Sequence, residues 1–167
     1  MDKNIPWNDL VEDYLKGPEV LSLAVEALPD DKLNLTLDKN KWTIREIVHH
    51  IVEGDDLFVP FIKQALGGIG GQYQINWYWD LSQIEWGKRW GFGVRDIRPA
   101  LALFKANREH TVSILGLIED PNEYTLDISW PDGPSEEISI YDVVGIQVQH
   151  LPEHLEEIRK ILGRSNK

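Results

Sequence analysis

The chain has 167 residues, of which 42% are hydrophobic and 27% charged, an ordinary globular usage that argues against disorder. Its 17 Lys and Arg against 28 Asp and Glu give a formal net charge of −11. Nucleic acid and anionic membranes are poor partners for such a surface, because phosphate binding requires clustered cations.

Cysteine is absent from the sequence, which excludes disulfides, thiolate ligands and a cysteine nucleophile. This absence is compatible with a reducing cytosol. The N-terminal residues form no apolar signal core, and no run approaches 18 apolar residues. We therefore expect a cytoplasmic protein without a membrane-spanning helix, folded as one domain over residues 1–167.

The first expected helix covers residues 8–28, where apolar side chains recur at helical spacing. Gly17 and Pro18 are predicted to kink or interrupt it, because proline removes an internal hydrogen bond.

The second helix has a clear start signal, since Thr43 and Glu46 form the pattern of a capping box. An apolar face then continues to Leu66, where two glycines end the helix. Pro60 is predicted to bend the helix near its end.

Two more helices are expected, over residues 96–118 and 139–162, and the last again begins with a cap at Ser139 and Asp142. Two short extended pieces between Thr125 and Ser139 flank a Pro-Asp-Gly-Pro turn and form either a hairpin or a loop. The sequence thus predicts an all-α protein, an antiparallel four-helix bundle with long second and third connections. The second and fourth helices should be adjacent.

Three histidines form the candidate site. His150 and His154 are four residues apart, so both imidazoles lie on one face of the last helix, within its apolar stripe. His50, from the second helix, would complete a three-histidine set with open positions, which is typical of a catalytic divalent-metal centre. Since ligand imidazoles must be neutral, metal occupancy should fall as the pH drops through about 6.5.

Pro152 stands between the paired histidines and would either kink the helix or force it to restart. A kink lets both imidazoles converge, and we favour it because the apolar stripe stays in phase across the proline.

The alternative interpretation of each polar residue is structural. A buried histidine is often hydrogen-bonded packing, His49 is expected to turn toward a neighbouring helix or solvent, and His110 has no partner at ligand spacing. Four carboxylates could orient a ligand imidazole, although helix-surface charge is the commoner explanation. These are Glu53, Asp55, Glu153 and Glu157.

Four tryptophans lie in the Gly-rich connection between the second and third helices: Trp77, Trp79, Trp86 and Trp90. They either anchor this long connection by burying aromatic area or line an apolar mouth over the metal, and both can hold. The run Gly-Gly-Ile-Gly-Gly lacks the lysine and the strand–loop–helix frame of a phosphate loop, so we reject nucleotide binding.

The pattern Trp-Thr-x-Arg-Glu-x-x-x-His at residues 42–50, with the histidine pair on the last helix, resembles the DinB/YfiT-like proteins. The resemblance covers about two-thirds of the chain and is loose over residues 67–95. It implies a four-helix bundle whose triad, here His50, His150 and His154, binds a divalent metal such as nickel or zinc. Members with known activity include thiol S-transferases and metal-dependent hydrolases, and the family suggests a homodimer.

Three functions are consistent with these features. The first is a metal-dependent enzyme acting on a small molecule, either by hydrolysis or by transfer to a low-molecular-weight thiol. A metal-bound water needs no protein nucleophile, which suits a chain without cysteine. The second is a metal or small-ligand binding protein without turnover, and the third is a self-associating bundle. Metal content separates the third from the others.

Overall fold

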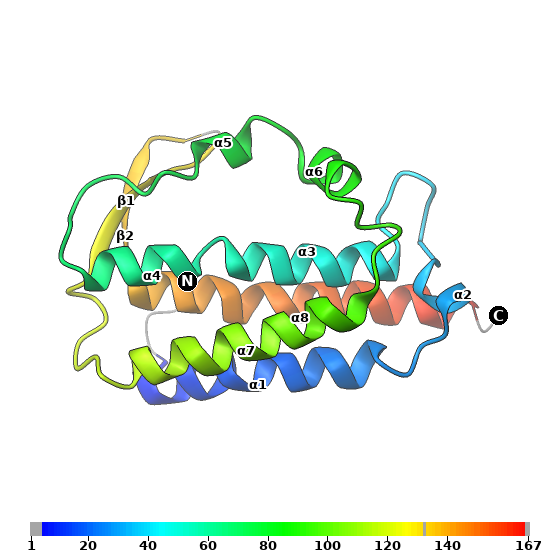
Figure 1. The fold of residues 1–167 in the computed structure, drawn as a ribbon, viewed down its shortest axis with the longest axis horizontal. Helices are drawn as coiled ribbons and strands as arrows, with labels where there is room; N and C mark the ends of the chain where they lie inside the picture. Colours follow the sequence, from blue (N-terminus) through cyan, green and yellow to red (C-terminus); the bar gives the residue numbers. More distant parts are fainter. Residues whose placement is uncertain (1–4, 132, 166–167) are drawn as a thin grey trace.

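The computed structural model describes residues 5–131 and 133–165, and four long helical segments build the fold (Figure 1). These are α1 (Trp7–Val25), α3 (Ile44–Asp56) continued by α4 (Val59–Leu66), α7 (Ile97–Leu115) and α8 (Ile140–Ser165). Shorter elements occupy the connections: α2 (Asp30–Leu33), α5 (Asn76–Trp79), α6 (Gln83–Arg89), β1 (Thr125–Ser129) and β2 (Ser135–Ser139). The predicted four-helix bundle is therefore present.

The direction of the helices differs from the predicted arrangement. In Figure 1, α1 and α8 run one way along the bundle, and α3 and α7 run the other way. Helix α1 packs against both α7 and α8, and α3 packs against the same two helices, so two of the neighbouring pairs are parallel. The wholly antiparallel bundle is not confirmed, because residues 67–96 cross the length of the bundle and return the chain to the end where α3 begins.

The second predicted helix is divided into two. We expected only a bend near Pro60, but α3 ends at Asp56 and α4 begins at Val59. The ring of a proline clashes with the carbonyl four residues earlier, which here belongs to Asp56, and proline also lacks an amide hydrogen. Pro60 instead occupies the first turn of α4, where neither defect matters.

Both predicted caps are present and fix the starts of the helices that bear the histidines. The Thr43 hydroxyl accepts from the Glu46 amide at 3.2 Å, and the Glu46 carboxylate accepts from the Thr43 amide at 2.8 Å. Ser139 and Asp142 exchange the same two bonds, at 3.2 and 3.0 Å. Each reciprocal pair satisfies two amides that a helix start leaves without partners.

Two helices continue through internal prolines. Pro18 lies inside α1 and Pro152 inside α8, and each helix is continuous across its proline. The interruption considered at Pro18 is absent, and α8 does not restart at Pro152. His150 and His154 therefore belong to one helix.

The extended pieces form a hairpin rather than a loop. Strands β1 and β2 pair antiparallel, with Leu126 opposite Ile138 and both side chains buried. The Tyr73 amide donates to the Asp127 carbonyl at 2.8 Å, which joins the start of the connection over residues 67–96 to β1. This contact holds that connection against the same end of the bundle as the hairpin.

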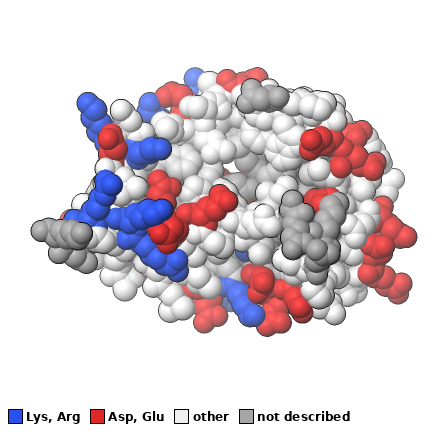
Figure 2. Space-filling view, turned by 180° about the vertical axis from the view of Figure 1, so that it is seen from behind, with Lys and Arg blue, Asp and Glu red and all other residues white. Residues whose placement is uncertain are grey.

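Charge is unevenly distributed over the surface. On the face opposite that of Figure 1, Lys and Arg gather with some acidic side chains toward the α2 end, whereas acidic side chains alone mark the other end (Figure 2). No helix among residues 5–131 and 133–165 combines the length and apolar character needed to cross a bilayer.

Candidate metal centre

The three predicted histidines meet inside the bundle. His50 projects from α3, and His150 and His154 project from successive turns of α8. The Nε2 atom of His150 lies 3.1 Å from Nε2 of His50 and 3.0 Å from Nε2 of His154. One nitrogen from each ring lies within 4.8 Å of the others. Residues a hundred positions apart thus present three nitrogens to one point.

Trp42 covers one side of the cluster. Its ring centroid lies 4.2 Å from that of His50 and 6.0 Å from that of His154. Trp42 directly precedes the capping box at Thr43, which fixes the start of α3. Sequence reasoning did not place this residue at the site, although a tryptophan eight positions before His50 was the available signal.

Burial makes all three imidazoles weak bases. Burial first, and then the charge of the neighbouring histidines, lower the pKa of His50 to about 2 and that of His150 to about 4. Burial also lowers the pKa of His154, although the Glu157 carboxylate opposes this effect. His50 and His150 are therefore neutral well below pH 6.5, so proton competition for the site moves to a lower pH than the sequence suggested.

Only one of the four candidate carboxylates contacts a histidine of the cluster. Glu157 Oε2 lies 3.4 Å from Nδ1 of His154, the ring nitrogen that faces away from the other histidines. Glu53 instead pairs with Arg95 at 2.8 Å, and Glu153 is exposed. Asp55 is buried in an ion pair with Arg108. It therefore neither orients a ligand imidazole nor contributes to the surface charge of its helix, the two roles expected for it.

The remaining histidines lie outside the cluster. His49 is buried, its ring stacks on Phe92 at 5.5 Å, and its Nε2 lies 3.3 Å from the Arg95 carbonyl. It therefore faces the end of the 67–96 connection rather than solvent. His110 is exposed on α7.

A second buried polar cluster is centred on Arg108, which is 1% exposed. Its guanidinium donates to one Asp55 oxygen from Nε at 3.0 Å and from Nη2 at 2.8 Å. It also donates to the carbonyls of Tyr14 at 2.8 Å and Gln147 at 3.2 Å. A Cβ at Gly17 would lie 2.3 Å from Nη1, so this approach requires glycine. Arg108 thus ties α1, α3 and α8 to α7.

A cavity of about 160 Å³ lies between the two clusters, and His50 and His150 line it on one side and Asp55, Arg108 and Gln147 on another. Its other walls are mainly aromatic and aliphatic. Tyr78 and Trp79 reach it from the 67–96 connection, and Trp130 reaches it from the hairpin. Trp86 and Trp90 therefore anchor the connection by packing against Tyr78 at 6.0 and 6.2 Å, and Trp79 lines a cavity beside two of the histidines.

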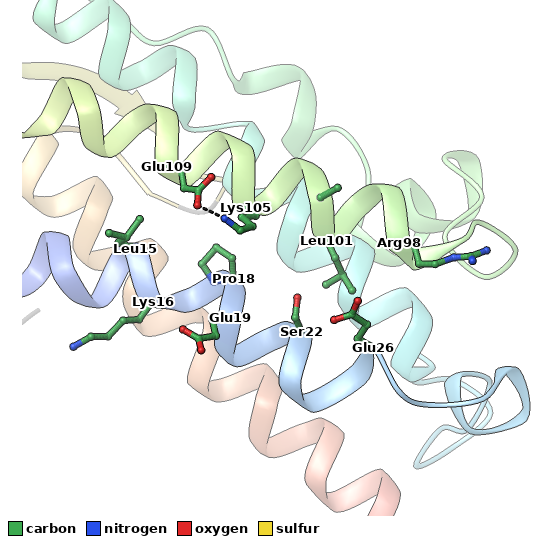
Figure 3. A pocket seen from close by; sticks show the side chains of 11 residues that line it. Leu15, Lys16, Pro18, Glu19, Ser22, Glu26, Arg98, Leu101, Lys105 and Glu109 are labelled. Carbon is green, nitrogen blue, oxygen red and sulfur yellow. Dashed lines mark hydrogen bonds and ion pairs between the residues drawn. The ribbon is translucent and has the colours of Figure 1, made fainter.

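A larger groove of about 670 Å³ lies elsewhere, between α1 and α7 (Figure 3). Leu15, Pro18 and Leu101 line it beside charged side chains, including the paired Lys105 and Glu109. It contains no histidine, so its size does not make it a site of chemistry.

Comparison with known proteins identifies a family and several relatives. A model of the DinB superfamily matches residues 14–158. A protein of Geobacillus thermodenitrificans named "Putative metal-dependent hydrolase" is 22% identical over 147 residues, which are 88% of this chain and 79% of the relative. A similarly named protein of Oceanobacillus iheyensis is 23% identical over 163 residues, which are 98% of this chain and 90% of the relative.

Among solved structures, YfiT from Bacillus subtilis resembles this fold with a TM-score of 0.83 and 20% sequence identity. The match covers 99% of this chain and 93% of YfiT. That protein is described as a probable metal-dependent hydrolase with an unusual four-helix bundle topology. At this identity, the likeness establishes the fold alone.

Proposed function

Since the chain belongs to the DinB superfamily, we propose that His50, His150 and His154 bind one divalent metal ion, nickel or zinc. The site would serve an enzyme that acts on a small molecule, with hydrolysis as its reaction. The relatives' names support the reaction class, and the geometry of the histidines supports a bound metal.

The observation that carries the proposal is the crowding around Nε2 of His150. This atom faces two other imidazole nitrogens at 3.1 and 3.0 Å. A neutral imidazole nitrogen either donates one hydrogen or offers one lone pair. It can therefore form a good hydrogen bond with one of its two neighbours, and the second close approach is left without one. A cation among the three nitrogens would satisfy all of them.

The donor set also fits such an ion. Nitrogens bound to zinc at ~2.1 Å in a tetrahedral arrangement lie roughly 3.4 Å from one another, slightly farther apart than the two close pairs here. Imidazole is a good ligand for zinc and nickel, and these rings are neutral, as ligation requires. When bound, the ion would supply Lewis acidity for hydrolysis. Trp42 would exclude water from one side, and Glu157 would orient His154.

Metal content tests the site directly. We expect elemental analysis of the purified protein, and titration calorimetry with Zn²⁺ and Ni²⁺, to show about one ion per chain. His50→Ala, His150→Ala and His154→Ala should each lose most of the affinity, whereas the matched variant His110→Ala should bind like wild type. Wild-type metal content and affinity in all three cluster variants would contradict the proposal.

Activity assays separate the remaining alternatives. Turnover of ester or amide substrates that depends on added metal supports a hydrolase. Turnover that additionally requires a low-molecular-weight thiol identifies an S-transferase, the alternative suggested by the family resemblance. Metal binding without turnover of either substrate class would favour a carrier or sensor.

Self-association is a separate part of the proposal. Helix α1 exposes Leu15, Val20 and Leu23, and their exposed fractions reach 79% at Leu23. Burial of this face against a second copy would form a homodimer. Analytical ultracentrifugation at micromolar concentration should show a dimer, and a monomer alone would contradict this part without affecting the metal site.

A further inference from the structure

The cavity beside His50 and His150 has a size that restricts its occupant. Its volume is about 160 Å³, close to the roughly 150 Å³ of an engineered apolar cavity that binds benzene. Pockets for drug-sized ligands are larger, on the order of 300–1,000 Å³. The space therefore accommodates one ring or a short branched chain, but not a nucleotide or a peptide segment.

The charge of the walls restricts the occupant further. Among the described residues that line the cavity, the charged side chains are Asp55 and Arg108, and they bind each other at 2.8 Å. A charged group that entered the apolar part would lose its hydration without finding a free counter-charge. An uncharged occupant avoids that cost.

The aromatic walls are fixed in place by their own contacts. The Trp79 indole donates to the Ser129 carbonyl at 2.8 Å, and its ring lies 5.8 Å from that of Trp130. The Tyr78 carbonyl accepts from the Trp86 indole at 2.8 Å. Walls held in this way present flat aromatic surface without the entropic cost of ordering it on binding.

We propose that this cavity binds an uncharged apolar group of the substrate, about the size of one aromatic ring, next to the bond that reacts at His50 and His150. The inference rests on the proposed function for its reaction, but the binding of the ring does not require the metal. It makes Gly54, Trp79 and Trp130 determinants of substrate size.

Gly54 offers the sharpest test. It lies inside α3 and lines the cavity, and a Cβ there would meet His150 Cε1 at an ordinary 3.7 Å. Replacing a helical glycine also favours the helix. Gly54→Leu should therefore fill the cavity while the protein folds, and Gly54→Ala should narrow it with less change. The matched control is Gly163→Leu in α8, where an added Cβ meets nothing within 4 Å.

Binding would be measured by fluorine NMR on metal-free protein, with 4-fluorobenzyl alcohol as the neutral probe and 4-fluorobenzoate as the charged one. We expect saturable binding of the alcohol and at least about tenfold weaker binding of the benzoate. Gly54→Leu should weaken binding of the alcohol at least about tenfold, and Gly163→Leu should leave it unchanged.

Trp79→Ala provides a gain of function. Because the cavity is enlarged, this variant should bind 4-fluoro-1-naphthylmethanol at least about tenfold more tightly than wild type does. Absence of saturable alcohol binding, or equal binding by wild type and a folded Gly54→Leu, would overturn the inference. Because the protein is metal-free in these experiments, that result leaves the metal proposal intact, and failed metal titration with normal probe binding would overturn the proposed function alone.

Discussion

Two buried polar clusters share α3 and α8 and differ in whether the charges of their members are paired. In the Arg108 cluster, a cation meets a carboxylate and two carbonyls, and its two charges cancel. In the histidine cluster, three bases of one kind face each other. Asp55 and Gln147 lie only five and three residues from His50 and His150 on their helices. A cluster whose charges are paired stabilises the fold, whereas three facing bases point to a cationic ligand.

The largest effect is expected from breaking the balanced cluster. Arg108→Met leaves the Asp55 carboxylate buried without its partner and should lower the free energy of unfolding by about 3–5 kcal/mol. Urea denaturation measures this change. Arg98→Met is the matched control, because the Arg98–Asp96 pair is on the surface and should contribute little to stability.

A double variant sharpens this prediction. Replacing both members, as in Arg108→Met with Asp55→Leu, removes the orphaned charge and should recover a large part of the lost stability. A double variant no more stable than Arg108→Met would show that the guanidinium bonds to Tyr14 and Gln147 matter more than the ion pair.

The unbalanced cluster should make the metal-free protein sensitive to acid. An unfolded histidine takes up a proton near pH 6.5, whereas burial holds the pKa of His150 at about 4 and that of His50 at about 2. Between these pH values the unfolded state binds more protons than the folded state. The contribution of these histidines to the free energy of unfolding is therefore fully present above pH 6.5 and is lost as the pH falls. The shift at His150 alone corresponds to about 3 kcal/mol.

Denaturation of metal-free protein between pH 7 and pH 4 measures this slope. His150→Phe should flatten it, and His110→Ala should leave it unchanged. An equal slope in wild type and His150→Phe would mean that other groups cause the acid sensitivity.

Adding a divalent cation should stabilise the histidine cluster. Zn²⁺ at 100 times its dissociation constant should raise the free energy of unfolding by about 2.7 kcal/mol, because it binds the folded state. A chelator should reverse the gain. His154→Ala should show no gain at the same Zn²⁺ concentration, and stabilisation of this variant equal to that of wild type would place the ion elsewhere.

The smallest effect is expected at the edge of the histidine cluster. Glu157→Gln removes the negative charge beside Nδ1 of His154, and it should weaken metal binding about tenfold, the low end for such partners. The contact is 3.4 Å long, which limits its effect. Titration calorimetry measures it, and the exposed Glu156→Gln serves as control; equal affinities in the two variants would remove Glu157 from the site.

The sequence predicted these two clusters with unequal success, for physical reasons. His150 and His154 share a helical face, and the capping box fixes the phase of His50, so local periodicity brings the histidines to the core. Arg108 stands among polar residues on α7, 53 positions from Asp55, and no local pattern pairs residues so far apart. Asp55 was consequently interpreted only as a partner for histidine or as surface charge.

The arrangement of helices was predictable only in part. The caps and the four helical segments are encoded by neighbouring residues, and these predictions are confirmed apart from the division of the second segment into α3 and α4. Of the hairpin and the loop that the sequence left open, the structure has the hairpin. The path of residues 67–96 depends on long-range packing of tryptophans and on a backbone contact with β1, which periodicity does not reveal. That path decides the relative direction of α3 and α7, which is why the antiparallel arrangement is not confirmed.

The separation of His50 from His150 in the sequence also has a consequence for the order of events during synthesis. A ribosome that adds about 5–20 residues per second needs roughly 5–20 seconds to progress from one histidine to the other. Throughout that interval the nascent chain holds a single residue of the proposed site. If the three histidines bind the proposed ion, loading can begin only after α8 has been made and has docked, so a bound ion would mark a folded bundle.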